Sequence, residues 1–245
     1  MQFKPNLRLL KDYNEVENHN SRRPPYIAIY RRGNKTLVYM GDRHAKKESW
    51  NMVDWCFSNQ FQFKPDVLLT EFENRGRNIT KDSRGKRNTL SHAAFVAARH
   101  NVPVVLADLS ESEMMSIIGT NDKKYLDEVL RAGPFADGNE LQQKCAKLNR
   151  FGRNRFMIQN IAAALNKYDT VFCIFGEGHF REQAAVLSSM LGDPEYIMTF
   201  PDMNTEFGKV KTGLFERARD NFLNMIHKME IVRLVEFKKE GEQHD

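Results

Sequence analysis

Short apolar runs alternate with amphipathic segments along most of this chain. Runs rich in β-branched and aromatic residues predict strands, and apolar positions that recur every three or four residues predict helices. Strands are expected at 26–30, 36–40, 66–70, 103–107, 171–175, 196–200 and 231–237. Helices are expected at 46–57, 89–98, 123–131, 140–166, 181–191 and 214–229, with a short one after the capping-box sequence that starts at Ser110. This alternation predicts an α/β fold with a central, mixed but mostly parallel sheet and helices on both faces.

The pattern shows no repeat and no linker, so residues 1–245 are expected to form a single domain. The first two strands flank Arg31–Lys35, whose glycine and asparagine predict a β-hairpin turn. Gly152 is a candidate interruption of the long helix at 140–166. Residues 1–25 are expected to be an irregular N-terminal arm, and residues 238–245 a charged tail.

The composition indicates a globular protein without membrane-spanning segments or disulfide bonds. With 245 residues and 41% hydrophobic content, the chain can bury a full core. No apolar run approaches the roughly 18 residues that span a bilayer, and the N-terminus lacks a signal-peptide pattern. The three cysteines have no metal-ligand spacing, which is typical of buried thiols in a reducing compartment. We therefore expect a cytoplasmic protein with no membrane association.

The net charge of +5 is modest, but the basic residues are unevenly distributed. Residues 74–88 carry six lysines and arginines against a single aspartate. This basic loop is either a solvated surface loop or a contact for an anionic substrate or partner. It contains no aromatic residue that would stack on bases, so nucleic-acid binding is not expected.

Two predicted strands end in the same short pattern. Gly41-Asp42-Arg43-His44 follows the strand at 36–40, and Gly176-Glu177-Gly178-His179 follows the strand at 171–175. The carboxyl ends of parallel strands meet at one edge of a sheet, where α/β proteins bind ligands. We therefore expect His44 and His179 to converge there.

Acidic residues follow two other strands: Glu71 and Glu73 after one, and Asp108 after the next. Two histidines and one of these carboxylates can hold a divalent cation. Alternatively, a carboxylate and an imidazole can activate a water without a metal ion. Each residue alone also fits an ordinary turn or capping role.

Several enzyme classes are excluded by missing motifs. The chain has no dinucleotide-binding fingerprint, no P-loop, no Gly-x-Ser-x-Gly elbow and no HExxH helix. Serine hydrolases of the elbow type, P-loop nucleotidases and zincin proteases are therefore not expected.

The order of the short motifs resembles the TraB/GumN–Tiki–ChaN–erythromycin esterase superfamily over about residues 26–200. That family has a Gly-x-x-His after an early strand, an acid after the next strand, an Arg-Asn-x-x-Met helix start and a second Gly-x-x-His. Here the third motif reads Arg153-Asn154-Arg155-Phe156-Met157. The chain departs from the family at Arg181-Glu182, where a glycine is expected, and at the leucine that follows Asp108.

The resemblance implies a soluble hydrolase that cleaves a peptide, amide or ester bond with an activated water. The Tiki-like members imply a divalent cation (Mn²⁺, Co²⁺, Zn²⁺ or Mg²⁺) held by His44, Glu71 and His179, whereas the erythromycin esterase-like members imply ester hydrolysis without a metal ion. The resemblance also implies a small-molecule or peptide substrate, with His44, Glu71, His179 and Arg153 as the central residues. Asp42, Glu73, Asp108, Asn154 and Glu177 would be supporting groups. Arg153 either holds a substrate carboxylate or oxyanion, or forms a structural salt bridge to Glu71 or Glu73. The alternative is a haem- or metal-binding protein, or a silent relative that binds an anionic partner through the basic loop.

Overall fold

The fold is described from a computed structural model that covers residues 2–11, 24–42, 47–59, 61–71 and 89–199. The strands are β1 (Tyr26–Arg32), β2 (Lys35–Asp42), β3 (Val67–Thr70), β4 (Val104–Leu106), β5 (Thr170–Gly176) and β6 (Tyr196–Thr199). The helices are α1 (Lys47–Cys56), α2 (Thr89–Arg99), α3 (Glu111–Ile118), α4 (Lys123–Ala132), α5 (Glu140–Leu148), α6 (Asn154–Lys167) and α7 (Glu177–Leu191). A π-helical segment, Asn149–Arg153, joins α5 to α6.

The strands form one sheet in the order β4-β3-β5-β2-β1-β6. The pairs β4–β3, β3–β5 and β5–β2 are parallel, whereas β1 pairs antiparallel with β2 and with β6. The predicted mixed, mostly parallel α/β sheet is therefore confirmed. In register, Gly176 lies opposite Asp42, and Thr70 lies opposite both Ile174 and Leu106. The four parallel strands consequently end at a common edge, which we call the carboxyl edge.

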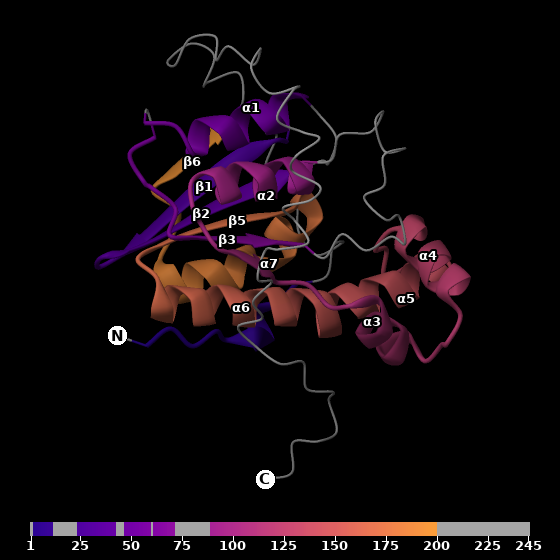
Figure 1. Cartoon of the computed structure of the whole chain (residues 1–245). Helices are drawn as coiled ribbons and strands as arrows, with labels where there is room; N and C mark the ends of the chain where they lie inside the picture. The colour runs from indigo at the N-terminus through magenta and orange to yellow at the C-terminus, as the bar shows by residue number, and fades with distance from the viewer. Residues whose placement is uncertain (1, 12–23, 43–46, 60, 72–88, 200–245) are drawn as a thin grey trace, which may run out of the picture.

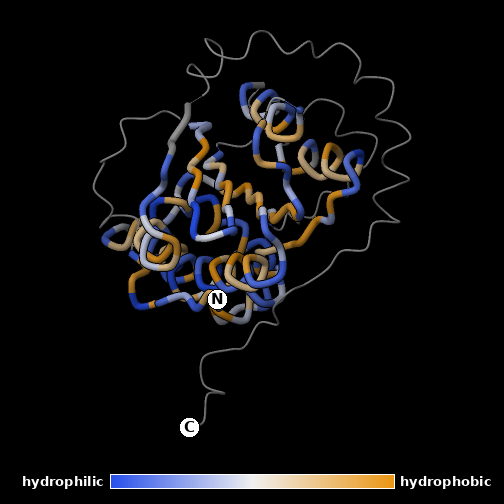
Figure 2. The backbone as a smooth tube through the Cα atoms, turned by 90° about the vertical axis from the view of Figure 1, so that its left-hand side faces the viewer, coloured by the Kyte–Doolittle hydropathy of each residue, from blue (hydrophilic) through white to orange (hydrophobic). Residues whose placement is uncertain are grey.

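Both faces of the sheet are covered by helices (Figure 1). Alternate side chains of each strand point to opposite faces, so each face has its own core. One core joins the sheet to α6 and α7, and the other joins it to α1 and α2. In Figure 2 hydrophobic residues run through the central strands and alternate with hydrophilic ones around the helices. This is the pattern expected for amphipathic helices on a buried sheet.

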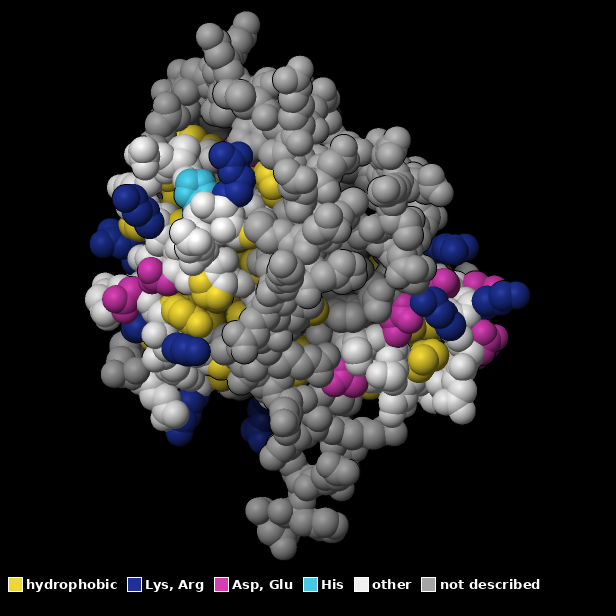
Figure 3. All heavy atoms as spheres, in the orientation of Figure 1, with side chains coloured by type: hydrophobic (Ala, Val, Ile, Leu, Met, Phe, Trp, Pro, Cys, Tyr) yellow, Lys and Arg dark blue, Asp and Glu magenta, His cyan; other side chains and the backbone are white. Residues whose placement is uncertain are grey.

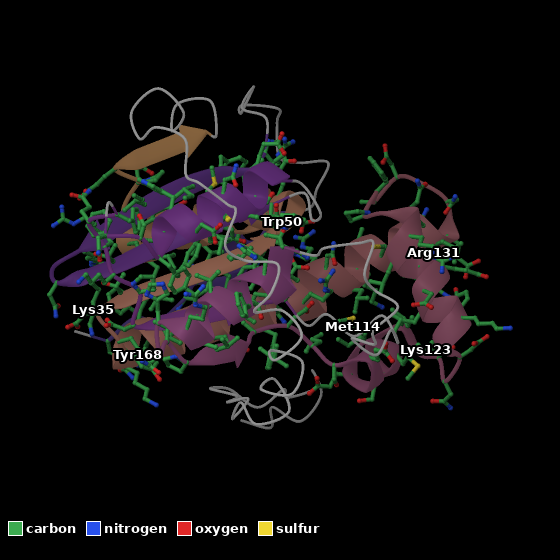
Figure 4. The ribbon with its side chains drawn as sticks, turned by 45° about the horizontal axis from the view of Figure 1, so that its top comes forward. Lys35, Trp50, Met114, Lys123, Arg131 and Tyr168 are labelled. Carbon is green, nitrogen blue, oxygen red and sulfur yellow. The ribbon has the colours of Figure 1, made fainter. Side chains whose placement is uncertain are left out.

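Helices α3, α4 and α5 form a separate group beside the carboxyl edge, and we call them the helical insert (Figure 1). They pack on a third core of their own, which includes Leu109, Met114, Leu126, Leu148 and Phe156. Figure 4 shows Lys35 and Tyr168 at one end of the molecule and Met114, Lys123 and Arg131 on the insert at the other. The insert carries basic and acidic side chains interleaved on its surface (Figure 3). The insert is therefore a small helical layer attached to the end of the sheet where the site is predicted.

The described part of the N-terminal arm is mostly irregular and is packed against the domain. Phe3 and Leu10 belong to the core under α6 and α7. The Phe3 backbone N–H donates to Asn166 Oδ1 at 2.7 Å, and the Asn166 amide donates back to the Phe3 carbonyl at 3.2 Å. The Lys11 N–H donates to the Glu182 carbonyl at 3.2 Å. The arm thus reaches the helix that carries His179.

Two predicted helices differ from the observed ones. The helix expected at 181–191 begins at Glu177, so His179 lies inside its first turn. The helix expected at 140–166 is interrupted around Gly152, as predicted, although by a π-helical segment. The helix at 214–229, the strand at 231–237, the basic loop at 74–88 and the tail at 238–245 lie outside the described residues. Within the described ranges, no helix is long and apolar enough to cross a membrane.

Candidate functional site

The carboxyl edge gathers most of the predicted site residues that the structure describes. Glu71 follows β3 directly, Asp108 lies two residues after β4, and β5 leads into α7 with His179. Arg153 and Asn154 arrive at the same edge from the junction between the π-helical segment and α6. His44 and Glu73 lie outside the described residues, so the convergence of the two histidines stays a prediction.

Arg153 forms a buried ion cluster with two carboxylates, which we call the Arg153 cluster. Its Nη2 donates to Asp108 Oδ2 at 2.6 Å and to Glu71 Oε2 at 3.2 Å. Its Nε donates to both Asp108 oxygens at 3.1 Å, and Nη1 donates to Asn149 Oδ1 at 3.4 Å. Each nitrogen of the guanidinium therefore has an acceptor. The structure therefore contains the expected salt bridge from Arg153 to Glu71, and it adds a second one to Asp108.

The charge state of the Arg153 cluster follows from burial and pairing. Burial by itself lowers the pKa of Arg153, but the negative charges of Asp108 and Glu71 outweigh it and raise that pKa above its ordinary value. The Asp108 side chain is fully buried, and burial raises its pKa, while the Arg153 charge opposes the rise. Arg153 is thus held as a cation between carboxylates, which is a rigid arrangement.

Glu71 also explains why α7 begins early. The cap position of this helix is Gly176, which has no side chain to satisfy the first backbone N–H groups. Instead, the Gly176 N–H donates to Glu71 Oε1, so β3 supplies a carboxylate to the N-terminus of α7. A negative charge there is also favoured by the helix dipole. Glu71 therefore links the Arg153 cluster to the helix that carries His179.

The π-helical segment brings the helical insert close to Arg153. A Cβ added at Gly152 would meet Ile117 Cδ1 at 2.6 Å and Leu109 Cδ1 at 3.0 Å. Only glycine allows α3 and the chain before it to approach the segment this closely. The extra residue of a π-helical turn rotates the side chains that follow it, and such turns are frequent at functional sites. Here Arg153 is the last residue of that turn.

His179 belongs to a second buried group, the His179 network, made of Tyr39, Asn154, His179, Glu182 and Gln183. His179 Nδ1 lies 2.7 Å from Asn154 Oδ1, and the Asn154 amide donates to Glu182 Oε2 at 2.5 Å. Gln183 Nε2 donates to Asn154 Oδ1 at 2.8 Å, and the Tyr39 hydroxyl donates to Gln183 Oε1 at 3.0 Å. Asn154 is fully buried and His179 is 6% exposed. The imidazole is thus held in one orientation.

The other predicted supporting groups lie elsewhere on the edge. Asp42 is buried at the end of β2 and accepts from the Ser49 hydroxyl at 2.5 Å. Glu177 pairs with Arg181 on the α7 face opposite His179. Tyr26 lies near this pair, and burial, assisted by the Glu177 charge, raises the pKa of its hydroxyl. Glu177 is therefore set apart from the His179 network.

The glycine of the first Gly-x-x-His motif is required by packing. A Cβ at Gly41 would meet Tyr26 Cζ at 2.7 Å and Cε2 at 2.9 Å. The Tyr26 ring cannot move away easily, because it is buried and packs edge-on against Phe180 with ring centroids 5.2 Å apart. Gly41→Ala is expected to lower the free energy of unfolding by about 1–3 kcal/mol through overpacking.

Urea denaturation of a double-mutant cycle checks this expectation. The same Gly41→Ala change in a Tyr26→Ala background should cost much less, because the ring is gone. An equal cost in both backgrounds would contradict the packing explanation.

The cysteines do not supply a nucleophile. Cys56, Cys145 and Cys173 are all buried free thiols, as predicted. Burial raises the pKa of Cys145 to about 11 and those of the other two well above the ordinary value. A thiol that stays protonated is a poor nucleophile and a poor metal ligand.

The described residues alone do not fit a metal ion. Among them, no group of three or more His, Cys, Asp or Glu side chains is close enough to hold one. Both oxygens of Glu71 accept hydrogen bonds, and the Arg153 guanidinium 3.2 Å away repels a second cation. His44, the third predicted ligand, lies outside the described residues. Among the described residues, the carboxylates at this edge are therefore bound to the protein's own donors.

No sequence motif assigned a site role to Glu182, Gln183 or Tyr39. Glu182 lies three residues after His179, which places both on one side of a helix. Because the helix was predicted to start at residue 181, His179 lay outside it, and the three-residue spacing from His179 to Glu182 did not indicate a shared helix face. The available signal was the pair Glu182-Gln183 next to the apolar residues of α7, since polar residues on a buried helix face need partners.

The basic loop lies outside the described residues, so the binding-protein alternative stays open. Comparison with protein-family models, curated proteins and solved structures finds no match for this chain. The superfamily resemblance accordingly stays a prediction carried by the short motifs.

Proposed function

We propose that this chain is a hydrolase of the TraB/Tiki/erythromycin esterase type, which cleaves a peptide, amide or ester bond with a water activated by His179. The observation that carries the proposal is the His179 network beside the Arg153 cluster. A buried imidazole held by a hydrogen bond through Nδ1 presents its other nitrogen in a fixed direction. Such an oriented imidazole is what general-base catalysis requires.

The proposed reaction uses one water per bond cleaved. His179 Nε2 removes a proton from the water while the water oxygen adds to the substrate carbonyl carbon. The carbon–nitrogen or carbon–oxygen bond then breaks, and the leaving group takes the proton from the imidazolium. The Arg153 cluster lies beside the His179 network and fixes the carboxyl edge in place, because the guanidinium is bonded to Asp108, Glu71 and Asn149.

His179→Gln tests the proposal with panels of peptides and p-nitrophenyl esters. We expect kcat/KM to fall by about 100-fold, because general-base catalysis contributes roughly 100-fold to 10,000-fold. His100→Gln is the matched control, because His100 is exposed at the end of α2 and should retain wild-type activity. Wild-type activity in His179→Gln would refute the proposal, and so would the absence of hydrolysis by the wild type.

The same assays with a chelator separate two forms of the mechanism. The metal-free form predicts activity that is insensitive to the chelator. Loss of activity that is restored by Mn²⁺, Co²⁺, Zn²⁺ or Mg²⁺ would instead assign water activation to a metal ion, with His179 Nε2 as one of its ligands.

A further inference from the structure

In the His179 network, Glu182 determines which group donates and which accepts in the neighbouring hydrogen bonds. An ionised carboxylate only accepts hydrogen bonds, so Asn154 must present its amide nitrogen to Glu182 Oε2, 2.5 Å away. The Asn154 oxygen then faces His179. An amide oxygen cannot donate, so the proton in the 2.7 Å contact must be on His179 Nδ1.

The other members of the network are consistent with this direction but do not impose it. Gln183 donates to the Asn154 oxygen and accepts from the Tyr39 hydroxyl. Burial raises the pKa of Tyr39 well above its ordinary value, so its hydroxyl keeps its proton. Hydroxyl and amide groups can each donate or accept, so Tyr39, Gln183 and Asn154 could all reverse together. An ionised Glu182 is the one member of this network that cannot reverse.

We propose that Glu182 acts through Asn154 to hold neutral His179 as the tautomer with Nδ1 protonated, which leaves the lone pair on Nε2. Glu182 is then a positioning residue that does not touch the substrate. Its Oε2 lies 4.0 Å from His179 Nδ1, beyond direct hydrogen bonding, so the effect passes through Asn154. The catalytic meaning of this tautomer rests on the proposed function, but the tautomer itself does not.

The tautomer can be measured on the wild-type protein by long-range ¹H–¹⁵N correlation spectra of ¹⁵N-histidine-labelled full-length chain. The chain has seven histidines, so the signals of His179 are assigned by their absence in His179→Gln. At a pH where this ring is neutral, we expect the pattern of a protonated Nδ1. A predominant Nε2–H pattern in the wild type would overturn the proposal.

Glu182→Gln tests the origin of the tautomer with little change in shape. Because charge-assisted hydrogen bonds are about twice as strong as neutral ones, we expect the ratio of Nδ1–H to Nε2–H forms to fall by about tenfold. Glu128→Gln makes the same change on an exposed position of α4 and should leave the ratio unchanged. An unchanged ratio in folded Glu182→Gln would overturn the proposal.

A swap of the two side-chain types supplies a second variant. In Asn154→Asp/Glu182→Gln the carboxylate moves next to His179, where it accepts directly from Nδ1, and the new glutamine donates to it. We expect the wild-type tautomer to return, and kcat to recover to within about threefold of the wild type after a roughly tenfold loss in Glu182→Gln. Failure of the double variant to restore the Nδ1–H form would contradict the relay.

The two proposals fail in different ways. If the tautomer ratio responds to Glu182→Gln but the wild type hydrolyses no substrate, the relay stands and the hydrolase proposal falls. If hydrolysis depends on His179 but the ratio does not respond, the hydrolase proposal stands and the relay falls.

Discussion

Replacing Arg153 by methionine is expected to lower the free energy of unfolding by about 3–5 kcal/mol, because it leaves buried carboxylates without their counter-charge. Asp108 has no exposed side-chain surface and Glu71 has 10%. Both accept hydrogen bonds from the same guanidinium. Methionine fills much of the arginine volume, so the loss reports the charge and the hydrogen bonds. Urea denaturation measures it.

Arg155→Met is the matched control for this prediction. Arg155 lies two residues further along, and its guanidinium packs over the exposed Phe151 ring at 6.0 Å. Its removal is expected to cost about 0.5–1 kcal/mol. A second check is Arg153→Met combined with Asp108→Asn, which should recover part of the stability because one buried charge is removed as well. Equal effects of the two arginine changes would contradict the buried ion cluster.

Asn154→Leu is expected to cost about 3 kcal/mol in unfolding free energy. The side chain is fully buried and joins three groups: His179, Glu182 and Gln183. Leucine is similar in size but gives no hydrogen bond, and each buried group that loses its partner costs about 1–3 kcal/mol. The loss is only partly offset by the gain from burying an apolar side chain.

Asn160→Leu on the same helix provides the comparison. Asn160 is also fully buried, but its amide makes one hydrogen bond, to the Phe156 carbonyl at 2.9 Å. Its Oδ1 has no partner within the described residues, so leucine there removes an unsatisfied acceptor. We expect a cost below about 1 kcal/mol. Similar losses in Asn154→Leu and Asn160→Leu would indicate that the His179 network adds nothing to stability.

The strands and their common edge could be predicted from the sequence because local signals define them. Apolar runs such as those in β2, β3 and β5 are too short for helices and are bounded by polar residues. Parallel strands then place whatever follows them at the same edge, which is why Glu71 and Asp108 could be assigned to one site. The interruption of the long helix was similarly marked by Gly152.

The partners within the site could not be predicted, because they depend on contacts between distant residues. The start of α7 is set by a hydrogen bond from Gly176 to Glu71, 105 residues earlier in the chain. Without that contact, helix propensity placed the start four residues later, so His179 and Glu182 were not expected to share one helix. Arg153 likewise had several acidic candidates, and packing alone selected Asp108 with Glu71.

The helical insert leaves the sheet and returns to it almost at one point. Asp108 precedes it and Arg153 follows it, 45 residues later, and the two side chains are paired. An insert whose two ends are joined by a salt bridge can change in length or sequence with little effect on the strands, because the entropy cost of closing a loop grows only slowly with its length. Evolution could therefore replace the whole insert while the residues at its two ends remain in place.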